Sequence, residues 1–105
     1  IVFLDYNKIQ SFGRTAEVLD LEPLAPKIKS FRWDVKEIDG HNFKEIISAV
    51  KEAKRNSGKP HCIIAHTVKG KGVSYMEDKL EWHYRSPTGD LMSQALIELG
   101  ADKIK

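Results

Sequence analysis

The chain has 105 residues, enough for one small domain and too few for two. Hydrophobic residues make up 41% and charged residues 30%, a balance typical of a folded globular protein rather than a disordered one. The net charge of +2 is too small to favour binding to nucleic acid or to an anionic membrane surface. The longest apolar runs have four residues, far short of the roughly 20 that span a membrane.

The sequence opens on IVFLDYN, an apolar run that passes directly into polar residues. This pattern predicts a strand that is buried from residue 1 onward. Because such a strand needs neighbours to pair with, we expect the chain to be part of a larger protein.

Residues 21–31 show helical spacing of apolar side chains, although Pro26 disfavours a regular helix there. Residues 33–39 predict a strand that ends at Asp39, where Gly40 lets the chain turn. A helix is then predicted, capped by Asn42 with Glu45 completing a capping box. Its apolar stripe consists of Phe43, Ile46, Ile47, Val50 and Ala53.

The segment HCIIAHTV, residues 61–68, is nearly all apolar and predicts a strand covered on both faces. The single cysteine, Cys62, lies in it and is interpreted as a small core residue; one cysteine also favours a reducing compartment, the cytoplasm. A last amphipathic helix is predicted around Thr88–Leu99, ending at Gly100. The fold class is α/β, with a mainly parallel sheet and helices on both faces.

Parallel sheets bind ligands at the carboxyl ends of their strands, where loops and helix N-termini converge. Three segments of this chain follow predicted strands: DYNKIQ, DGHN and TVKGKG. The third matches neither the P-loop nor the dinucleotide-binding fingerprint. Its glycines and Lys69 suit contact with a phosphate group, and the alternative is a turn with exposed lysines.

Other polar residues have more than one reading. Asn7 is either a ligand of a divalent cation or a turn residue, and His83 is a general acid, a hydrogen-bond donor to phosphate or a packing neighbour of Trp82. His61 and His66 face opposite sides of one predicted strand, which argues against a zinc site. His41 is expected at the helix entry, bonded to nearby backbone.

Three stretches taken in order carry a family resemblance: FLDYNKIQ, FRWDVKEIDGHNFKEI and GKPHCIIAHTVKGKGVSYMEDKLEWH. The chain closely resembles the second half of the thiamine diphosphate-binding domain of transketolases, including split enzymes in which this domain is a separate subunit. Asp-Gly-His, Lys-Gly-Lys-Gly and Trp-His at these spacings make the resemblance specific.

The resemblance implies a role for four residues. Asn7 would give a side-chain oxygen, and Ile9 its backbone carbonyl, to a Mg²⁺ or Ca²⁺ ion that holds the cofactor's diphosphate. Lys69 and His83 would lie at the diphosphate, with His83 also near the reacting groups.

The sequence also departs from the family pattern. The Gly-Asp-Gly motif, whose Asp is a further metal ligand, does not occur in the chain, and we expect it upstream of residue 1. Tyr84 stands where transketolases often have glycine, which bears on sugar preference. The family's partner domain, whose glutamate activates the aminopyrimidine, is also outside the sequence, so these residues alone should be inactive.

The resemblance thus implies a transferase that moves a two-carbon ketol unit between sugar phosphates, in the pentose phosphate pathway. Its partners would be a pyrimidine-binding transketolase domain or subunit, in a homodimer or a heterotetramer. Two alternatives stay open: a synthase of the 1-deoxyxylulose-5-phosphate type, and a non-catalytic α/β module that binds phosphate or a partner through the lysine-rich loop.

Overall fold

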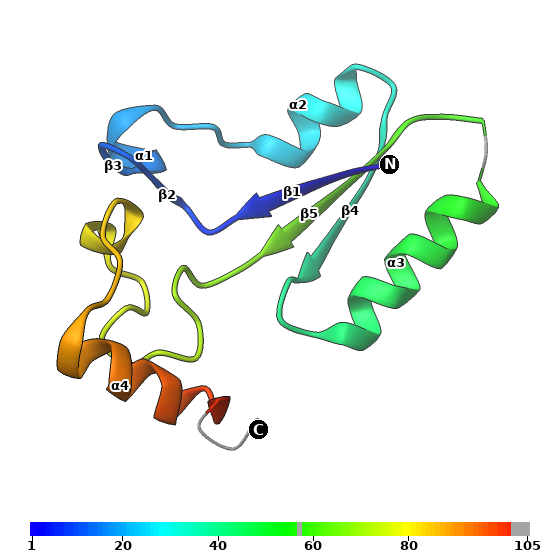
Figure 1. The fold of residues 1–105 in the computed structure, drawn as a ribbon. Helices are drawn as coiled ribbons and strands as arrows, with labels where there is room; N and C mark the ends of the chain where they lie inside the picture. The colour runs from blue at the N-terminus through cyan, green and yellow to red at the C-terminus, as the bar shows by residue number, and fades with distance from the viewer. Residues whose placement is uncertain (57, 102–105) are drawn as a thin grey trace.

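The computed structural model describes residues 1–56 and 58–101, and its centre is a three-stranded parallel sheet (Figure 1). The strands are β1 (Val2–Tyr6), β4 (Asp34–Asp39) and β5 (His61–His66), in the spatial order β1-β5-β4. Helices α2 (Leu24–Ser30) and α3 (Phe43–Arg55) cover opposite faces, which confirms the predicted α/β class. The last four residues of the predicted domain range, 102–105, lie outside the described residues.

The central strand β5 is buried on both sides, as its sequence predicts. Cys62 and Ile64 pack toward α2, while Ile63 and Ala65 pack toward α3. The alternation follows from the two-residue period of a strand, which sends successive side chains to opposite faces. Burial of its thiol raises the pKa of Cys62, which fits a core residue rather than a nucleophile.

The prediction that the first strand is buried from residue 1 is wrong for the structure described. β1 is an edge strand: Leu4 and Tyr6 pack toward α2, but Phe3, on the other face, is 48% exposed. The reason is that α3 lies over β4 and β5 and does not extend over β1. The apolar run therefore predicted the strand correctly, but it did not predict that one face of the strand would be left without a helix packed against it.

At the start of α3, Asn42 caps the helix as predicted, whereas Glu45 accepts from groups other than the Asn42 backbone N–H that a capping box uses. The Asn42 side chain accepts hydrogen bonds from the backbone N–H groups of Lys44 and Glu45, at 3.1 and 3.4 Å. Glu45 in turn accepts from the Asn42 side-chain amide and from the backbone N–H of Asp39, both at 2.9 Å. Caps of this kind stabilise a helix by about 1 kcal/mol and fix where it begins.

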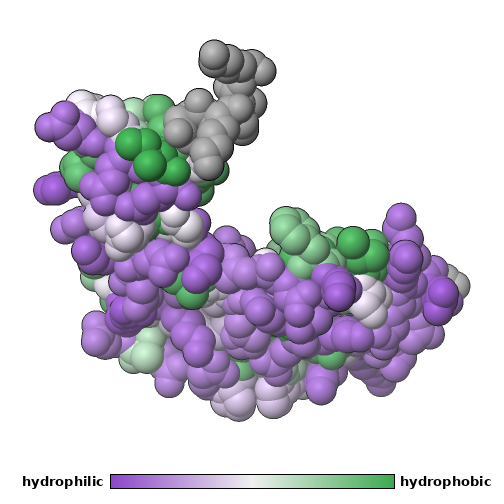
Figure 2. Space-filling view, turned by 90° about the horizontal axis from the view of Figure 1, so that it is seen from below, coloured by the Kyte–Doolittle hydropathy of each residue, from purple (hydrophilic) through white to green (hydrophobic). Residues whose placement is uncertain are grey.

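The predicted apolar stripe of α3 is only partly used. Ala53 is buried, and Ile46 and Val50 pack against the core cluster that contains the buried Ala49. Phe43 and Ile47 are instead 79% and 53% exposed, so the stripe is wider than the contact with a three-stranded sheet. Figure 2 shows apolar side chains breaking an otherwise hydrophilic surface in separate patches.

The remaining helices begin and end close to the predicted positions. In α2, Pro26 lies in the first turn, where its missing N–H costs no helical hydrogen bond. The last helix, α4 (Gly89–Glu98), is followed by Gly100 in the left-handed conformation, with φ +66°. The predicted apolar side of α4 is mostly uncovered. Ala95 is buried, but Leu91, Leu96 and Leu99 are exposed.

Four short elements were not predicted, and they lie at the carboxyl edge of the sheet (Figure 1). They are β2 (Ile9–Gln10), β3 (Gly13–Arg14), helix α1 (Thr15–Val18) and the 3₁₀ helix η1 (Leu80–His83). β2 and β3 form an antiparallel hairpin, and η1 packs against β2. No helix among the described residues is long and apolar enough to cross a membrane.

Candidate functional site

The three parallel strands end in the same row of the sheet. Tyr6 is paired with His66, and His66 with Asp39, so the segments that follow leave from one edge. Gly40 comes close to the segment after β5: its N–H donates to the His66 carbonyl at 2.8 Å, and an added Cβ would lie 2.4 Å from Thr67 Cγ2. Glycine is required here because any side chain would push the two strand ends apart.

Asn7 forms a tight turn directly after β1. Its Oδ1 accepts a hydrogen bond from the backbone N–H of Ile9 at 2.9 Å, and Lys8 between them has φ +63°. Ile9 is buried and begins the β2–β3 hairpin. An amide oxygen has a second lone pair, so this bond leaves Asn7 able to contact a cation. We call residues 7–9 the Asn7 turn.

Lys69 lies near the start of the long segment that follows β5. We call this segment, residues 67–84, the Lys69 loop. The backbone folds back at once: the Lys69 carbonyl accepts from the N–H of Asp78 at 2.9 Å. Gly70 has φ +71°, and an added Cβ would lie within 3 Å of the Met76 backbone. Only glycine can make this turn without strain, which accounts for the first glycine of Lys-Gly-Lys-Gly.

The two lysines of the Lys-Gly-Lys-Gly motif differ in their surroundings. Lys71 forms an ion pair with Glu77, with Nζ and Oε1 3.4 Å apart. Glu77 also accepts from the N–H of Gly72 at 3.0 Å, and this hydrogen bond is the main cause of its lowered pKa. Lys69 is half-buried at the edge itself. The charge of Lys71 is thus partly neutralised by Glu77 within the loop, whereas Lys69 lies where the strand ends converge.

His83 ends η1 and is exposed. Packing beside Trp82 is one of the three readings of His83. The Trp82 ring meets Tyr75 edge to face, with ring centroids 5.0 Å apart, and the Trp82 Nε1–H donates to the Tyr75 carbonyl. The His83 ring instead meets Tyr84 edge to face, with centroids 4.8 Å apart.

Tyr84, which the sequence left unexplained, reaches across to the hairpin. Its hydroxyl donates to the carbonyl of Ser11 at 3.4 Å, and its ring lies against His83. Since η1 also packs against β2, His83 is brought to the hairpin that follows the Asn7 turn. The sequence-predicted residues Asn7, Ile9, Lys69 and His83 therefore lie on two segments that meet at one edge.

Three residues at this edge were missed or misread from the sequence. Arg14 donates two hydrogen bonds to the Asp78 carboxylate, at 2.8 and 2.6 Å, which lowers the pKa of Asp78 and raises that of Arg14. His41 Nε2 accepts from the backbone N–H of Val68 at 2.8 Å, so its partner is the Lys69 loop and not nearby backbone as expected. No local pattern signals contacts between segments so far apart.

The other histidines lie at opposite ends of β5. His61 Nε2 is 2.6 Å from the Asn56 carbonyl at the amino end, whereas His66 pairs with Glu37 at 2.8 Å near the carboxyl end. The described residues contain no group of three or more His, Cys, Asp or Glu side chains that could hold a metal. A cation at the carboxyl edge would therefore depend on amide, carbonyl and phosphate oxygens.

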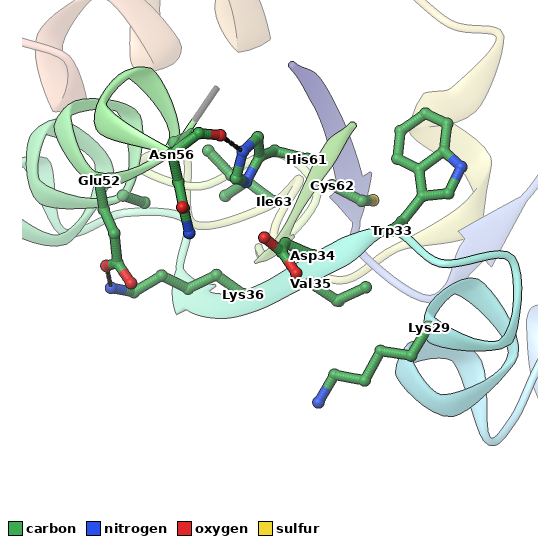
Figure 3. Close-up of a pocket in the computed structure, with 12 residues that line it drawn as sticks. Lys29, Trp33, Asp34, Val35, Lys36, Glu52, Asn56, His61, Cys62 and Ile63 are labelled. Carbon is green, nitrogen blue, oxygen red and sulfur yellow. Dashed lines mark hydrogen bonds and ion pairs between the residues drawn. The ribbon is translucent and has the colours of Figure 1, made fainter. Parts of the chain in front are cut away.

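The cavity shown in Figure 3, about 320 Å³, is at the amino end of the sheet and away from these residues. Part of its polar lining is paired internally: Lys36 with Glu52, and His61 with the Asn56 carbonyl (Figure 3). We therefore place the candidate site at the carboxyl edge, where an oxygen pair, a lysine and a histidine suit a metal-bridged anion.

Comparison with known proteins identifies the family of the chain. Residues 1–104 match the family described as transketolase, thiamine diphosphate binding domain. The chain is 50% identical over 99 residues to SqwG, a 6-deoxy-6-sulfo-D-fructose transketolase subunit from Clostridium sp. (strain MSTE9), covering 94% of this chain and 36% of that protein. It is 38% identical over 99 residues to one of the apulose-4-phosphate transketolase subunits of Phocaeicola vulgatus, covering 94% and 35%.

Among solved structures, transketolase from Campylobacter jejuni superposes with a TM-score of 0.81 at 28% identity, over 93% of this chain and 15% of that one. The chain thus spans about a third of the length of the curated relatives it matches. The family match covers nearly every residue, including each segment of the carboxyl edge. The chain belongs to the transketolase family, in its thiamine diphosphate-binding domain.

Proposed function

We propose that this chain supplies the diphosphate half of a thiamine diphosphate site, in an enzyme that transfers a two-carbon ketol unit between sugar phosphates. In this proposal residues 1–105 are the C-terminal part of the cofactor-binding domain. The observation that carries it is the in-register ending of β1, β5 and β4, which sets the Asn7 turn and the Lys69 loop side by side. The family match supports the choice of cofactor.

The oxygen ligands and the basic side chains at the carboxyl edge fit a metal-bound diphosphate. Asn7 Oδ1 and the Ile9 carbonyl would be two oxygen ligands of Mg²⁺, or of Ca²⁺, which take six or more. Diphosphate oxygens and water would supply others, and a carboxylate would come from outside these 105 residues, since the sequence has no Gly-Asp-Gly. Lys69 and His83 would offset the remaining charge of the diphosphate.

Each proposed site residue would then have a defined role. Thiamine diphosphate, when bound, supplies the stabilisation of a carbanion that the reaction needs. Lys69 would hold the diphosphate by charge, and the Asn7 turn would hold the metal ion. His83, exposed on η1, would donate a hydrogen bond to the diphosphate and to polar groups of the substrate.

The family and the names of relatives support further parts of the proposal. Relatives are named as subunits, which is consistent with a pyrimidine-binding partner subunit or domain and with a homodimer or heterotetramer. Two relatives are named for 6-deoxy-6-sulfo-D-fructose and apulose 4-phosphate. We propose sugar phosphates as substrates, with sulfonated fructose as a donor to be tested beside them. The lone, buried Cys62 fits a cytoplasmic location.

The test uses the full-length protein with its partner. Calorimetry would measure the affinity for thiamine diphosphate with Mg²⁺ for the wild type, Asn7→Ala and His83→Ala. We expect both variants to bind at least about tenfold more weakly, because each removes a contact to a charged group. Unchanged affinity in both would refute the site, and absence of cofactor binding in the wild type would favour the non-catalytic alternative.

A further inference from the structure

The β2–β3 hairpin that follows the Asn7 turn is joined to the Lys69 loop by an ion pair that bridges 64 positions of the sequence. The Arg14 guanidinium donates from two nitrogens to the two carboxylate oxygens of Asp78, at 2.8 and 2.6 Å. One of those nitrogens also lies 3.4 Å from the Asp78 carbonyl. This forked geometry fixes the guanidinium plane relative to the carboxylate, which a single contact would not do.

Each end of the pair is one hydrogen-bonded step from a candidate ligand residue. The backbone N–H of Asp78 donates to the Lys69 carbonyl at 2.9 Å. Arg14 is paired with Ile9 across the β2–β3 hairpin. A continuous path therefore runs from Lys69 through Asp78 and Arg14 to Ile9, and it spans the gap between the proposed diphosphate and metal ligands.

The pair is placed to hold geometry rather than to stabilise the fold. The side chains of Arg14 and Asp78 are 45% and 52% exposed, and exposed ion pairs contribute little to stability. Asp78 also has φ +57°, a left-handed conformation that is uncommon for residues other than glycine. An exposed pair in an unusual backbone conformation is better explained by the spacing that it sets.

We propose that Arg14 and Asp78 are positioning residues that fix the distance between the metal ligands of the Asn7 turn and the diphosphate ligand Lys69. This inference rests on the proposed function. Neither side chain touches the cofactor; they act through Ile9 and Lys69. Without the pair, the Tyr84–Ser11 bond and η1 still join the far end of the loop to the hairpin, but the link that sets Lys69 relative to Ile9 is lost, and metal and diphosphate no longer meet their ligands together.

The experiment compares Arg14→Ala, Asp78→Asn and the double variant in the full-length protein with its partner. Calorimetry measures thiamine diphosphate affinity at saturating Mg²⁺, and Mg²⁺ affinity at fixed thiamine diphosphate. We expect each single variant to weaken both affinities about tenfold, and the double variant to be no weaker than either single one, because both remove the same link. The charge-reversed pair Arg14→Asp with Asp78→Arg should recover part of the loss.

Lys36→Ala is the matched control, because Lys36 forms an exposed ion pair with Glu52 at the far end of the sheet. It should change neither affinity. Additive losses in the double variant would overturn the inference and leave the proposed function standing. The same holds if both single variants bind within twofold of the wild type while Asn7→Ala and His83→Ala bind weakly. If Asn7→Ala and His83→Ala also bind normally, the proposed function fails with it.

Discussion

The body of the sheet and its carboxyl edge are held together by different forces. In the body, β1, β4, β5, α2 and α3 meet through two clusters of buried apolar side chains, one on each face. At the edge, the β2–β3 hairpin, the Lys69 loop and α4 bury fewer apolar side chains, Ile9, Val73 and Ala95, and are joined by hydrogen bonds and ion pairs such as Arg14 with Asp78 and Ser74 with Glu98. The body supplies stability, whereas the edge supplies geometry, and mutations should separate the two.

The largest expected effect is in the body. Ile64 is 1% exposed at the centre of the sheet, so Ile64→Ala should lower the free energy of unfolding by about 2–5 kcal/mol. Ile64→Val should cost about 0.5–1.5 kcal/mol by the same mechanism. Urea unfolding of the full-length protein measures both. Cofactor affinity at low temperature should stay near that of the wild type, and a loss as large as that of Asn7→Ala would blur the distinction between the two regions.

The next effect is at the edge, in its backbone. Gly70→Ala adds a Cβ at φ +71° and within 3 Å of the Met76 backbone, a strain of about 1–3 kcal/mol. Because the strain falls on the residue after Lys69, we expect weaker thiamine diphosphate binding as well as a lower melting temperature. Gly58→Ala, where an added Cβ meets nothing within 4 Å, is the control and should change neither. Equal behaviour of the two variants would contradict this account of the turn.

A smaller effect on stability and cofactor affinity is expected from two histidines. Each bonds to the backbone, and they lie at opposite ends of the sheet. His41 accepts from the Val68 N–H beside Lys69, whereas His61 contacts the Asn56 carbonyl. Alanine at either position should cost about 0.5–1.5 kcal/mol of stability. Only His41→Ala should weaken cofactor binding, because its partner precedes Lys69. Calorimetry on both variants checks this, and parallel losses of affinity would argue against a local role for His41.

The smallest effect is a response to acid that is confined to the edge. The N–H groups of Gly72 and Ser74 donate to Glu77 and Glu98, and these bonds are the main cause of the lowered pKa of each carboxyl group. A group whose pKa is lowered by folding stabilises the folded state above its unfolded pKa, near 4.3 for Glu, and the contribution is lost as the pH falls through the folded value.

Hydrogen exchange, corrected for intrinsic rates, should therefore show Gly72 and Ser74 losing protection below about pH 4. The N–H of Gly40 donates to a backbone carbonyl and serves as the control. It should keep its protection over the same range. Simultaneous loss at all three amides would indicate that the whole chain opens together.

The sequence by itself determined the elements of the body. The alternation and length of the apolar runs predicted β4, β5 and α3, and Asn42 with Glu45 predicted where α3 begins. These features depend on neighbours within a few residues, so a local pattern records them. The resemblance of three stretches to transketolases further pointed to Asn7, Ile9, Lys69 and His83 as site residues.

Only the tertiary structure decided which faces are covered and how the edge is joined. Phe3 and Phe43 have the same apolar character as the core, yet both are exposed because the sheet has three strands and α3 covers two of them. The Arg14–Asp78 pair and the bond from Val68 to His41 join residues 64 and 27 positions apart. Such contacts depend on how the strands are ordered in space, and no spacing along the chain encodes that order.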